Sequence, residues 1–549
     1  MNNIKPGALA KIVFGIYVLF AIHLPIPHIG GTGLYLPFNI MAWIFISLII
    51  GLGAYQIFIS KQFHFSQFNM YSWIGLALML IPFTYQNNAY SNFATMRVLG
   101  LGSGILLMLA YQQFQFDRED LFNFLYMIIG CILIQTLFKL IEQFIPNSNL
   151  IGILPIIHFG PMVQKNIFAT YICTGATISL VLVLIDDRLP DHRWKQALVY
   201  SVPLIGLTQF YPLQSRTGYL SLLLGIGFIL LISFRSIKRI WPWLGMAFIG
   251  LMVGFIDREA IRSEEAIEYS GNSRKTTYLL TYELIRENPI FGVGYGGFLP
   301  AFREHYAERK KSDSSIPFIG NNNMDHPHNE ILFWTVEGGI LPLIGILIIA
   351  GSFLSMVWKA KKKKAWLMLG MLIPIIVHTQ LELPFYISVI HWFTFIYLTH
   401  MIDEECGENY ELAISYSYVF RGLSMIIPMV VLIYMITTLQ TAMLITKFER
   451  TGHRDPSILV SITNPHAWQK KYETLIMKLN LIIAKQTKDE EKLIDYIEWA
   501  EKYVQHSPYL FIYYDLATAY ESLNKRKKAW EIYRHAQYLY PGAKWREEQ

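Results

Sequence analysis

The chain has 549 residues, of which 53% are hydrophobic and only 16% are charged, and its mean hydropathy is +0.34. Soluble domains carry about 25% charged residues, so this composition excludes an ordinary soluble protein and predicts a polytopic membrane protein. The net charge of +6 comes largely from lysines and arginines in short loops between apolar segments, which indicates membrane topology rather than nucleic-acid binding.

The N-terminal segment, MNNIKPGALAKIVFGIYVLFAIHLP, is interpreted as the first membrane span because no small-residue cleavage site follows its apolar core. A membrane helix needs about 20 mainly apolar residues, and windows of this kind predict about 13 spans. They fall near 8–25, 38–59, 71–86, 95–112, 120–144, 165–186, 196–213, 217–235, 239–257, 329–357, 365–384, 386–402 and 419–446. We therefore expect an all-α fold in which residues 1–446 form a transmembrane domain.

Basic residues in short loops predict which loops face the cytoplasm. If the KAKKKK run at 359–364 lies inside, the other basic loops alternate as expected, whereas loops 26–37, 86–94 and 145–164 contain no lysine or arginine. The long loop 258–328 and the tail are then predicted outside. Cys131, Cys173 and Cys406 are far apart, which excludes a disulfide framework and a CxxC metal site.

The long loop and the tail are the polar parts of the chain. In the loop, NSRKTTYLLTYELIRENP predicts a helix from Ser273 to Asn288-Pro289. GVGYGG at 292–297 has no preceding strand and no GK[ST] after it, so it indicates a tight turn rather than a nucleotide loop. The tail, 447–549, is predicted to be a TPR-like helical domain that either docks a protein partner or serves as a stabilising hairpin. The residues that match the tetratricopeptide pattern are Tyr513, Leu516, Ala517, Tyr520, Ala529, Tyr533, Ala536 and Pro541.

Polar residues suited to catalysis gather on the predicted outer face. An arginine near hydrocarbon is costly enough to indicate a function, although Arg216 also fits a side chain that reaches the lipid headgroups. Arg274 also fits an exposed helical charge. Together, two guanidinium groups suit a phosphate-bearing lipid head. The candidates come from five stretches: Gln164 and Asn166 in MVQKNIFAT, Arg216 in QSRTGYL, Arg274 in the long loop, Asp325, His328 and Glu330 in DHPHNE, and Glu382 and Tyr386 in HTQLELPFYISV.

His328 allows three interpretations. Asp325, His326 and His328 offer metal ligands, but their spacing does not give the i, i+4 helix face of known zinc motifs, so a metal is the least favoured. His328 suits a general base that is oriented by Asp325 or Glu330. The segment also suits a helix cap provided by Asn329 or Asp325. The residues alone leave the base and the cap open.

The string NSRKTTYLLTYELIRENPIFGVGYGGF, followed by DHPHNEILFWTVEGGI, resembles the signature region of the O-antigen ligase/polymerase superfamily of bacterial inner-membrane proteins. With QKN at 164–166, LELPFY and the C-terminal extension, the chain is most similar to the PglL-like protein O-oligosaccharyltransferases, or pilin glycosylation ligases. This resemblance implies a multi-pass enzyme of the inner (cytoplasmic) membrane with a periplasmic active site. It would transfer a glycan en bloc from undecaprenyl pyrophosphate to a Ser or Thr hydroxyl of a periplasmic or pilin-like protein, with no metal and no cofactor.

Carried over residue by residue, the resemblance assigns roles. The essential histidine matches His328, rather than His326, and is expected to accept the proton of the acceptor hydroxyl. Lys165 departs from the pattern, because Q-P-N has a proline there. The other matches are Arg216 and Arg274, which are expected to hold the pyrophosphate, Gln164 of the Q-x-N motif, and Tyr386 of the late LE-P-Y motif; Asn166, Glu382, Asp325 and Glu330 are expected to support substrate binding.

Three classes of function fit these residues. Transfer to a protein is favoured by the motifs and by the tail. An O-antigen ligase that uses a lipid A-core acceptor, or a polysaccharide polymerase, would have the same fold and a carbohydrate acceptor. A lipid-glycan transporter is disfavoured, because it would carry ionisable residues in mid-membrane rather than gathered on one face.

Overall fold

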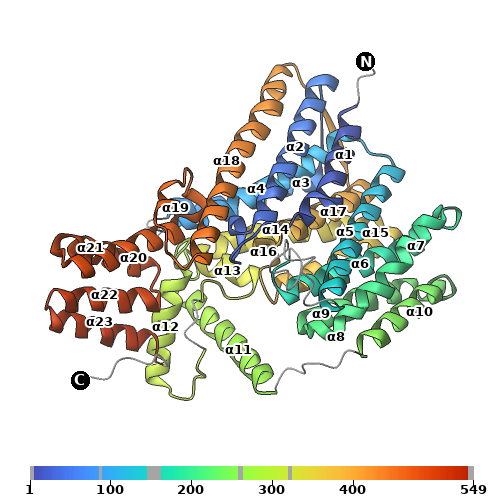
Figure 1. Cartoon of the computed structure of the whole chain (residues 1–549). Coiled ribbons are helices and arrows are strands. Elements are labelled where there is room, and N and C mark those ends of the chain that lie inside the picture. Colours follow the sequence, from blue (N-terminus) through green and yellow to red (C-terminus); the bar gives the residue numbers. More distant parts are fainter. Residues whose placement is uncertain (1–4, 86–89, 145–161, 257–263, 320–323, 542–549) are drawn as a thin grey trace.

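The computed structural model describes residues 5–85, 90–144, 162–256, 264–319 and 324–541, which form a helical bundle, a helical loop region and a helical tail (Figure 1). In this part of the chain, eight segments have the length and hydropathy of membrane spans. One of these segments, Arg216–Gly254, covers two helices. The architecture is that of an all-α membrane protein, as the composition predicts, while the number of 13 spans stays a prediction.

The bundle is made of apolar helices packed around α6, most of whose side chains are buried. Its helices are α1 (Pro6–Leu19), α2 (Pro37–Ser60), α3 (Gln67–Leu80), α4 (Thr95–Phe114), α5 (Arg118–Phe144), α6 (Lys165–Ile185), α7 (Arg193–Ser201), α8 (Phe210–Leu213), α9 (Arg216–Ser233), α10 (Ile237–Gly254), α14 (Ile340–Ala360), α15 (Lys363–Thr379), α16 (Pro384–Ile387), α17 (Val389–Cys406) and α18 (Tyr418–Arg450). Because α6 is enclosed on all sides, the residues at its start are held in place by the surrounding helices.

The bundle has two distinct ends, which we call the loop end and the sheet end. At the loop end, α2 begins beside α17, and the Asn39 side chain donates a hydrogen bond to the carbonyl of Ile387 at 3.1 Å. At the sheet end, the same two helices lead to β1 (Gln62–Ser66) and β2 (Asn409–Ala413), which pair antiparallel with Gln62 opposite Ala413. This strand pair was not predicted, because it joins segments far apart in the chain.

The predicted span 329–357 is two helices in the structure, α13 (Glu330–Gly338) and α14. Gly339 separates them with a φ of 75°, and a Cβ at this position would lie 2.0 Å from the carbonyl oxygen of Ile290. Only glycine fits both the backbone conformation and the close approach. The expectation of one continuous helix was therefore wrong, since apolar residues on both sides hide the break.

The loop region contains α11 (Glu264–Glu287) and α12 (Phe298–Ser312). The first helix ends where the sequence predicts but begins at Glu264 rather than Ser273. The glycine segment between the helices forms a turn, as predicted: the N–H groups of Val293 and Gly294 donate to carbonyls at the end of α13 at 2.8 and 2.9 Å. These bonds fix the loop region against the helix that follows DHPHNE.

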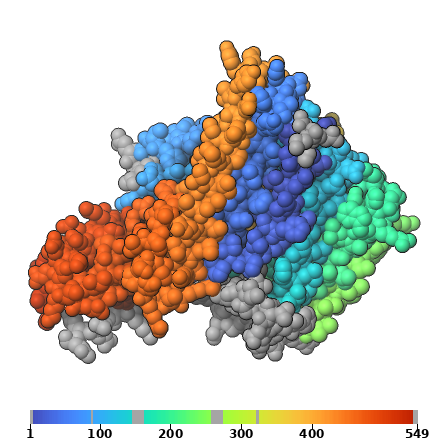
Figure 2. All heavy atoms as spheres, turned by 45° about the horizontal axis from the view of Figure 1, so that its top comes forward, coloured from blue at the N-terminus to red at the C-terminus, as the bar shows by residue number. Residues whose placement is uncertain are grey.

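The tail is a succession of packed helices at the end of α18 (Figure 1), and in Figure 2 it forms the red region at the left, beside the orange α18. They are α19 (Ser457–Val460), α20 (Gln469–Thr487), α21 (Glu490–His506), α22 (Leu510–Ser522) and α23 (Arg526–Leu539). Of the predicted tetratricopeptide positions, Leu516, Ala517 and Ala536 are fully buried. The tail also contacts α12, where the Arg303 guanidinium lies 4.5 Å from the centre of the Tyr540 ring. Its assignment as a TPR-like domain stays a prediction.

Candidate active site

The DHPHN segment, residues 325–329, leads into α13, and the structure describes the chain here from Met324 onward. His328 has a φ of 56°, in the left-handed region that non-glycine residues seldom occupy. Its carbonyl accepts a hydrogen bond from the Tyr278 hydroxyl at 3.1 Å, and the next residue, Asn329, caps α13 by accepting from the N–H of Leu332 at 2.9 Å. The cap predicted for this segment is thus Asn329, while the His328 side chain is turned toward another part of the chain.

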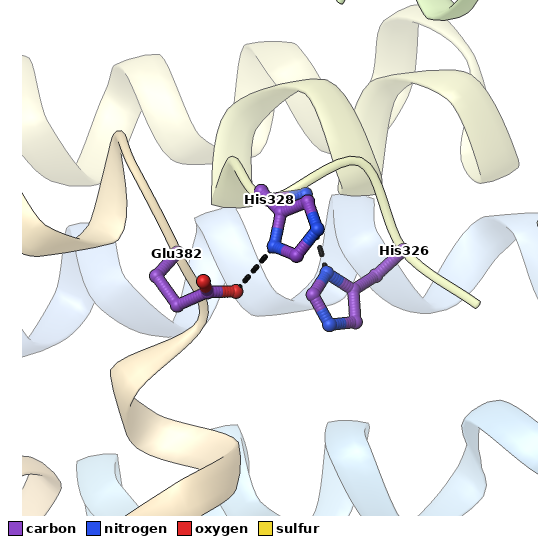
Figure 3. A group of neighbouring side chains, drawn as sticks. All are labelled: His326, His328 and Glu382. Carbon is purple, nitrogen blue, oxygen red and sulfur yellow. Dashed lines mark hydrogen bonds and ion pairs between the residues drawn. The ribbon is translucent and has the colours of Figure 1, made fainter. Parts of the chain in front are cut away.

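His328 contacts Glu382, which lies in the turn after α15 (Figure 3). The distance between His328 Nδ1 and Glu382 Oε1 is 2.5 Å. The other carboxylate oxygen of Glu382 accepts a longer bond from Arg274 Nη2 at 3.4 Å. Glu382, rather than Asp325 or Glu330, is therefore the carboxylate that orients His328, and it holds the histidine and the arginine of the long loop in one group.

Electrostatics in this group favours an ionised Glu382. Burial raises the pKa of Glu382, but the hydrogen bond and charge of His328, together with the charge of His326, outweigh burial and hold that pKa down to about 2. A carboxylate ionised at neutral pH accepts hydrogen bonds only. The proton of neutral His328 is therefore on Nδ1, and Nε2 carries the lone pair that is able to accept a proton.

His326 packs beside His328 with the ring centres 4.5 Å apart. Its Nδ1 accepts the backbone N–H of His328 at 3.2 Å, and its Nε2 lies 3.7 Å from the Asp325 carboxylate. Burial lowers the pKa of His326. One ligand atom from each of His326, His328 and Glu382 lies within 4.8 Å of the others, which suits a divalent metal. This geometry gives the metal interpretation more support than the sequence spacing did.

Glu330 and Tyr386 form a second contact beside the histidines. The Tyr386 hydroxyl donates to Glu330 Oε2 at 3.5 Å. Burial raises the pKa of Glu330 to about 8, although the charge of Arg97 lowers it. At neutral pH Glu330 is therefore mainly protonated, which excludes it as the ionised partner of His328 and leaves it as a hydrogen-bond donor.

Arg97 was not among the residues singled out from the sequence. It pairs with Glu337 at 2.5 Å, with both side chains at most 7% exposed, and its guanidinium lies 4.2 Å from the centre of the Trp334 ring. A lone arginine in the apolar window around NFATMRVLG is the kind of intramembrane charge that indicates a function. That signal was present in the sequence and was missed.

Gln164, Asn166 and Arg216 gather at the starts of α6 and α9. Asn166 Oδ1 accepts from Ser215 Oγ at 2.8 Å, and Ser215 in turn caps α9 by accepting from the N–H of Gly218 at 3.0 Å. Arg216 is the first residue of α9 and is exposed, as is Gln164 before α6. The Asn166–Ser215 hydrogen bond therefore holds the starts of these two helices together.

The structure does not connect this second group to the first. Among the described residues, no hydrogen bond or ion pair joins Gln164, Asn166 or Arg216 to His328 or Glu382. Most of the predicted outer loop before Gln164, residues 145–161, lies outside the described part of the chain. The candidate site therefore consists of two groups of residues, and the structure shows no direct contact between them among the described residues.

Two family models match the chain. The model described as O-Antigen ligase matches residues 204–347, and the model described as Virulence factor membrane-bound polymerase, C-terminal, matches residues 366–549. No curated protein matches the sequence. The first match contains Arg216, Arg274 and His328, and the second contains Glu382 and Tyr386. Together they support a place for this chain in the O-antigen ligase/polymerase superfamily, as a membrane glycosyl-transferring ligase or polymerase.

Proposed function

We propose that this chain is an O-linked oligosaccharyltransferase that moves a glycan en bloc from undecaprenyl pyrophosphate to a Ser or Thr hydroxyl of a periplasmic or pilin-like protein. One observation carries the proposal: a histidine oriented by an ionised carboxylate lies beside a guanidinium, in the group of His328, Glu382 and Arg274. The ligase and polymerase matches support the type of reaction, and the resemblance of the motifs to PglL-like enzymes supports the protein acceptor. We place this site on the periplasmic face of the bacterial inner membrane.

In this reaction His328 is the general base. Its Nδ1–H is held by Glu382, so Nε2 accepts the proton as the acceptor oxygen attacks the anomeric carbon. A carbon–oxygen bond forms to the acceptor while the bond from the anomeric carbon to the pyrophosphate oxygen breaks. The electron pair of the broken bond leaves with undecaprenyl pyrophosphate, and the anomeric centre inverts. Glu382 stabilises the imidazolium that His328 becomes.

Arg274 is proposed to bind the leaving pyrophosphate, together with Arg216. The Arg274 side chain is 33% exposed and makes a hydrogen bond of 3.4 Å to Glu382 through one nitrogen. A guanidinium carries five donors, so several remain for phosphate oxygens. The charge that develops on the leaving group is thereby stabilised without a proton donor on the phosphate side.

Tyr386 and protonated Glu330 are proposed to form hydrogen bonds with the sugar nearest the reacting bond. The Tyr386 proton is directed at Glu330, so its oxygen would accept from a sugar hydroxyl, while Glu330 would donate to one. Neutral groups orient sugar hydroxyls without competing with the pyrophosphate for the arginines. Gln164 and Asn166, at the start of α6, are proposed to take part in substrate binding from the second group of the site.

Transfer to a carbohydrate acceptor is the second candidate. The descriptions of the two matching families, an O-antigen ligase and a membrane-bound polymerase, are consistent with it as well. The roles of His328, Glu382 and Arg274 would be unchanged, because a sugar hydroxyl attacks as a protein hydroxyl does. Only the acceptor differs between the two candidates.

Reconstitution separates these candidates. The purified chain in lipid vesicles is given an undecaprenyl-pyrophosphate-linked oligosaccharide and one of three acceptors: a pilin-like protein, lipid A-core, or a second molecule of the donor. We expect glycan on the protein; glycan on lipid A-core or longer lipid-linked chains would establish the second candidate instead. If no acceptor gains glycan while the donor is bound, both candidates fail.

A chelator tests the metal interpretation of the same site. We expect transfer to continue in EDTA, because His328 Nδ1 is engaged by Glu382 as a hydrogen-bond donor rather than as a ligand. Loss of activity in EDTA, restored by one divalent metal, would show instead that His326, His328 and Glu382 bind that metal. His326→Ala is the matched variant: it removes one of the three ligands and keeps the contact between His328 and Glu382.

A further inference from the structure

A cavity of about 1520 Å³ lies between the bundle and the tail. His326 and Glu330 line it on the side of the reactive loop. Lys470, Tyr509 and Phe511 line it on the side of the tail. The tail therefore lines the same space as the candidate active site, although Lys470 follows Glu330 by more than a hundred residues in the chain.

The cavity continues down the outside of the bundle. There it is lined by side chains of α2, α4 and α18, and α2 packs against both of the other helices. Figures 1 and 2 show α18 running along α2 toward the tail. Leu99, Leu106 and Val430 line this part and are 57%, 38% and 55% exposed. Exposed apolar residues on helices of this length face hydrocarbon in a membrane protein, so the lower part of the cavity is open to lipid chains.

The charges around the cavity leave one cation without an ion-pair partner. Its lining includes four basic and four carboxyl side chains: Arg97, Lys470, Lys471 and Lys478, and Asp325, Glu330, Glu337 and Glu449. Three of the basic residues are paired, since Arg97 contacts Glu337, Lys471 contacts Glu449 and Lys478 contacts Asp515. Lys470 has no ion pair among the described residues, and Glu330 is mainly protonated at neutral pH. The lining therefore accommodates a ligand that carries an anionic group beside its neutral parts.

Aromatic rings dominate the upper part of the cavity. Phe93 and Phe511 line it and are 39% and 41% exposed, and Tyr509 lines it beside them. The Lys470 ammonium lies 3.7 Å from the centre of the Phe93 ring, and no carboxylate of the described residues is within ion-pair distance of it. Flat apolar faces with a few hydrogen-bond donors are the usual lining of a site for a small polar ring system. A sugar presents such rings, with hydroxyl groups at their edges.

We infer that this cavity binds a lipid-linked saccharide, with its hydrocarbon chain between α2, α4 and α18 and its sugar units against Lys470, Tyr509 and Phe511 of the tail. The inference rests on the proposed function, in which this molecule is the donor. The junction between lipid and sugar then lies beside His326 and Glu330, in the loop that carries His328. The tail accordingly determines which glycans the protein accepts, rather than serving only as a docking surface or a stabilising hairpin.

Binding without turnover tests this inference. The full chain carrying His328→Ala is placed in nanodiscs, and two probes are titrated: a polyprenyl-pyrophosphate-linked oligosaccharide, and the same polyprenyl pyrophosphate without sugar. Adding Lys470→Gln or Phe511→Ala is expected to weaken binding of the first probe about tenfold and to leave the second within about twofold. Val430→Trp, which fills the lower part of the cavity, is expected to weaken both.

Matched controls keep the outcome clear. Lys485→Gln changes an exposed lysine on the same helix as Lys470, and Trp530→Ala removes a ring that is 37% exposed in the tail; neither lines the cavity, and neither is expected to change binding. Phe511 is 41% exposed, so its truncation leaves no internal void. Unchanged binding of the sugar-bearing probe by both tail variants would overturn the inference, as would binding of an acceptor peptide that depends on the same two residues. If the chain binds the donor in this cavity but transfers no glycan to any acceptor, the proposed function is wrong and the inference about the cavity still holds.

Discussion

The two ends of the bundle each contain a network of polar side chains, and the networks differ in access and in backbone strain. At the sheet end, Asn69 donates to Gln112 at 2.6 Å, and Gln112 donates to Asp403 at 2.7 Å. All three side chains are at most 3% exposed and join α3, α4 and α17. At the loop end, the His328 side chain is 25% exposed and its backbone is in the left-handed region.

This difference separates a structural network from a reactive one. Buried hydrogen bonds between helices stabilise the fold and leave no room for a substrate, so the sheet-end network has a structural role. Strained backbone combined with an accessible base is typical of active sites. Substitutions at the loop end should therefore reduce activity far more than stability, and substitutions at the sheet end should do the opposite.

The largest effect is expected at His328. His328→Ala removes the proposed base, and transfer should fall about 10³-fold, the usual range for loss of general base catalysis. The free energy of unfolding at neutral pH should also fall, by about 3 kcal/mol at most, because buried Glu382 loses the partner that holds it ionised. Glycan transfer by purified protein in vesicles and unfolding in detergent measure the two quantities. His192→Ala, at an exposed histidine in the loop after α6, is the control; equal loss of activity in both variants would contradict the assignment.

Acid should destabilise the loop end through Glu382. Its folded pKa is lowered to about 2 from an unfolded value of 4.5, so its ionised form stabilises the folded protein above pH 4.5. That contribution, about 3 kcal/mol at most, is lost as the pH falls from 4.5 toward 2. Glu382→Gln does not titrate and should show a flatter dependence of unfolding free energy on pH over this range. Parallel pH dependences in the two proteins would show that Glu382 is not held ionised by His328.

Glu382→Gln also tests the orientation of the base at neutral pH. The amide keeps the shape of the side chain but no longer stabilises a positive charge on His328, and we expect transfer to fall about 10²-fold. Glu382→Asp, which keeps the charge and shortens the side chain, should retain more activity than the amide. If Glu382→Gln were as active as the parent protein, the carboxylate of Glu382 would not be needed for the action of His328.

The sequence predicted the helices better than the contacts between them. Apolar windows identified the helices of the bundle, because their length and hydropathy are local properties. The break at Gly339 was missed since it depends on the approach of Ile290. The strand pair of 62–66 with 409–413 was missed for the same reason, because it joins segments more than three hundred residues apart.

The site shows the same division. His328, Arg274 and Glu382 were all selected from the sequence, because chemistry and predicted sidedness pointed to them. Their pairing was not predicted: Asp325 and Glu330 were the expected partners of His328 because they are its neighbours in the sequence. The left-handed backbone at His328 turns its ring toward the turn after α15, and this conformation has no local signal in a non-glycine residue.

A smaller effect of the opposite kind is expected at the sheet end. Gln112→Ala leaves the buried side chains of Asn69 and Asp403 without their shared partner, which should lower the unfolding free energy by about 1–3 kcal/mol. Activity per folded molecule should be unchanged, since the network is at the end of the bundle opposite His328. Unfolding midpoints and transfer rates normalised to folded protein measure both. A loss of activity without a loss of stability would show that the sheet end takes part in the reaction.

The smallest effect is expected at Asn329, a structural residue inside the loop-end site. Its side chain caps α13 through Leu332 and donates to the carbonyl of Gln380 at 3.0 Å. Asn329→Ala removes both contacts and should lower the unfolding free energy by about 1 kcal/mol, as loss of an N-cap usually does. Asn329→Asp keeps the cap and should recover most of that stability, so unfolding curves of the two variants measure the cap alone. Because Asn329 adjoins His328 but does not touch the reacting atoms, activity should fall much less than in His328→Ala. An equal fall would mean that the position of His328 depends on the helix cap, and the separation between structural and reactive networks would then fail within the loop end itself.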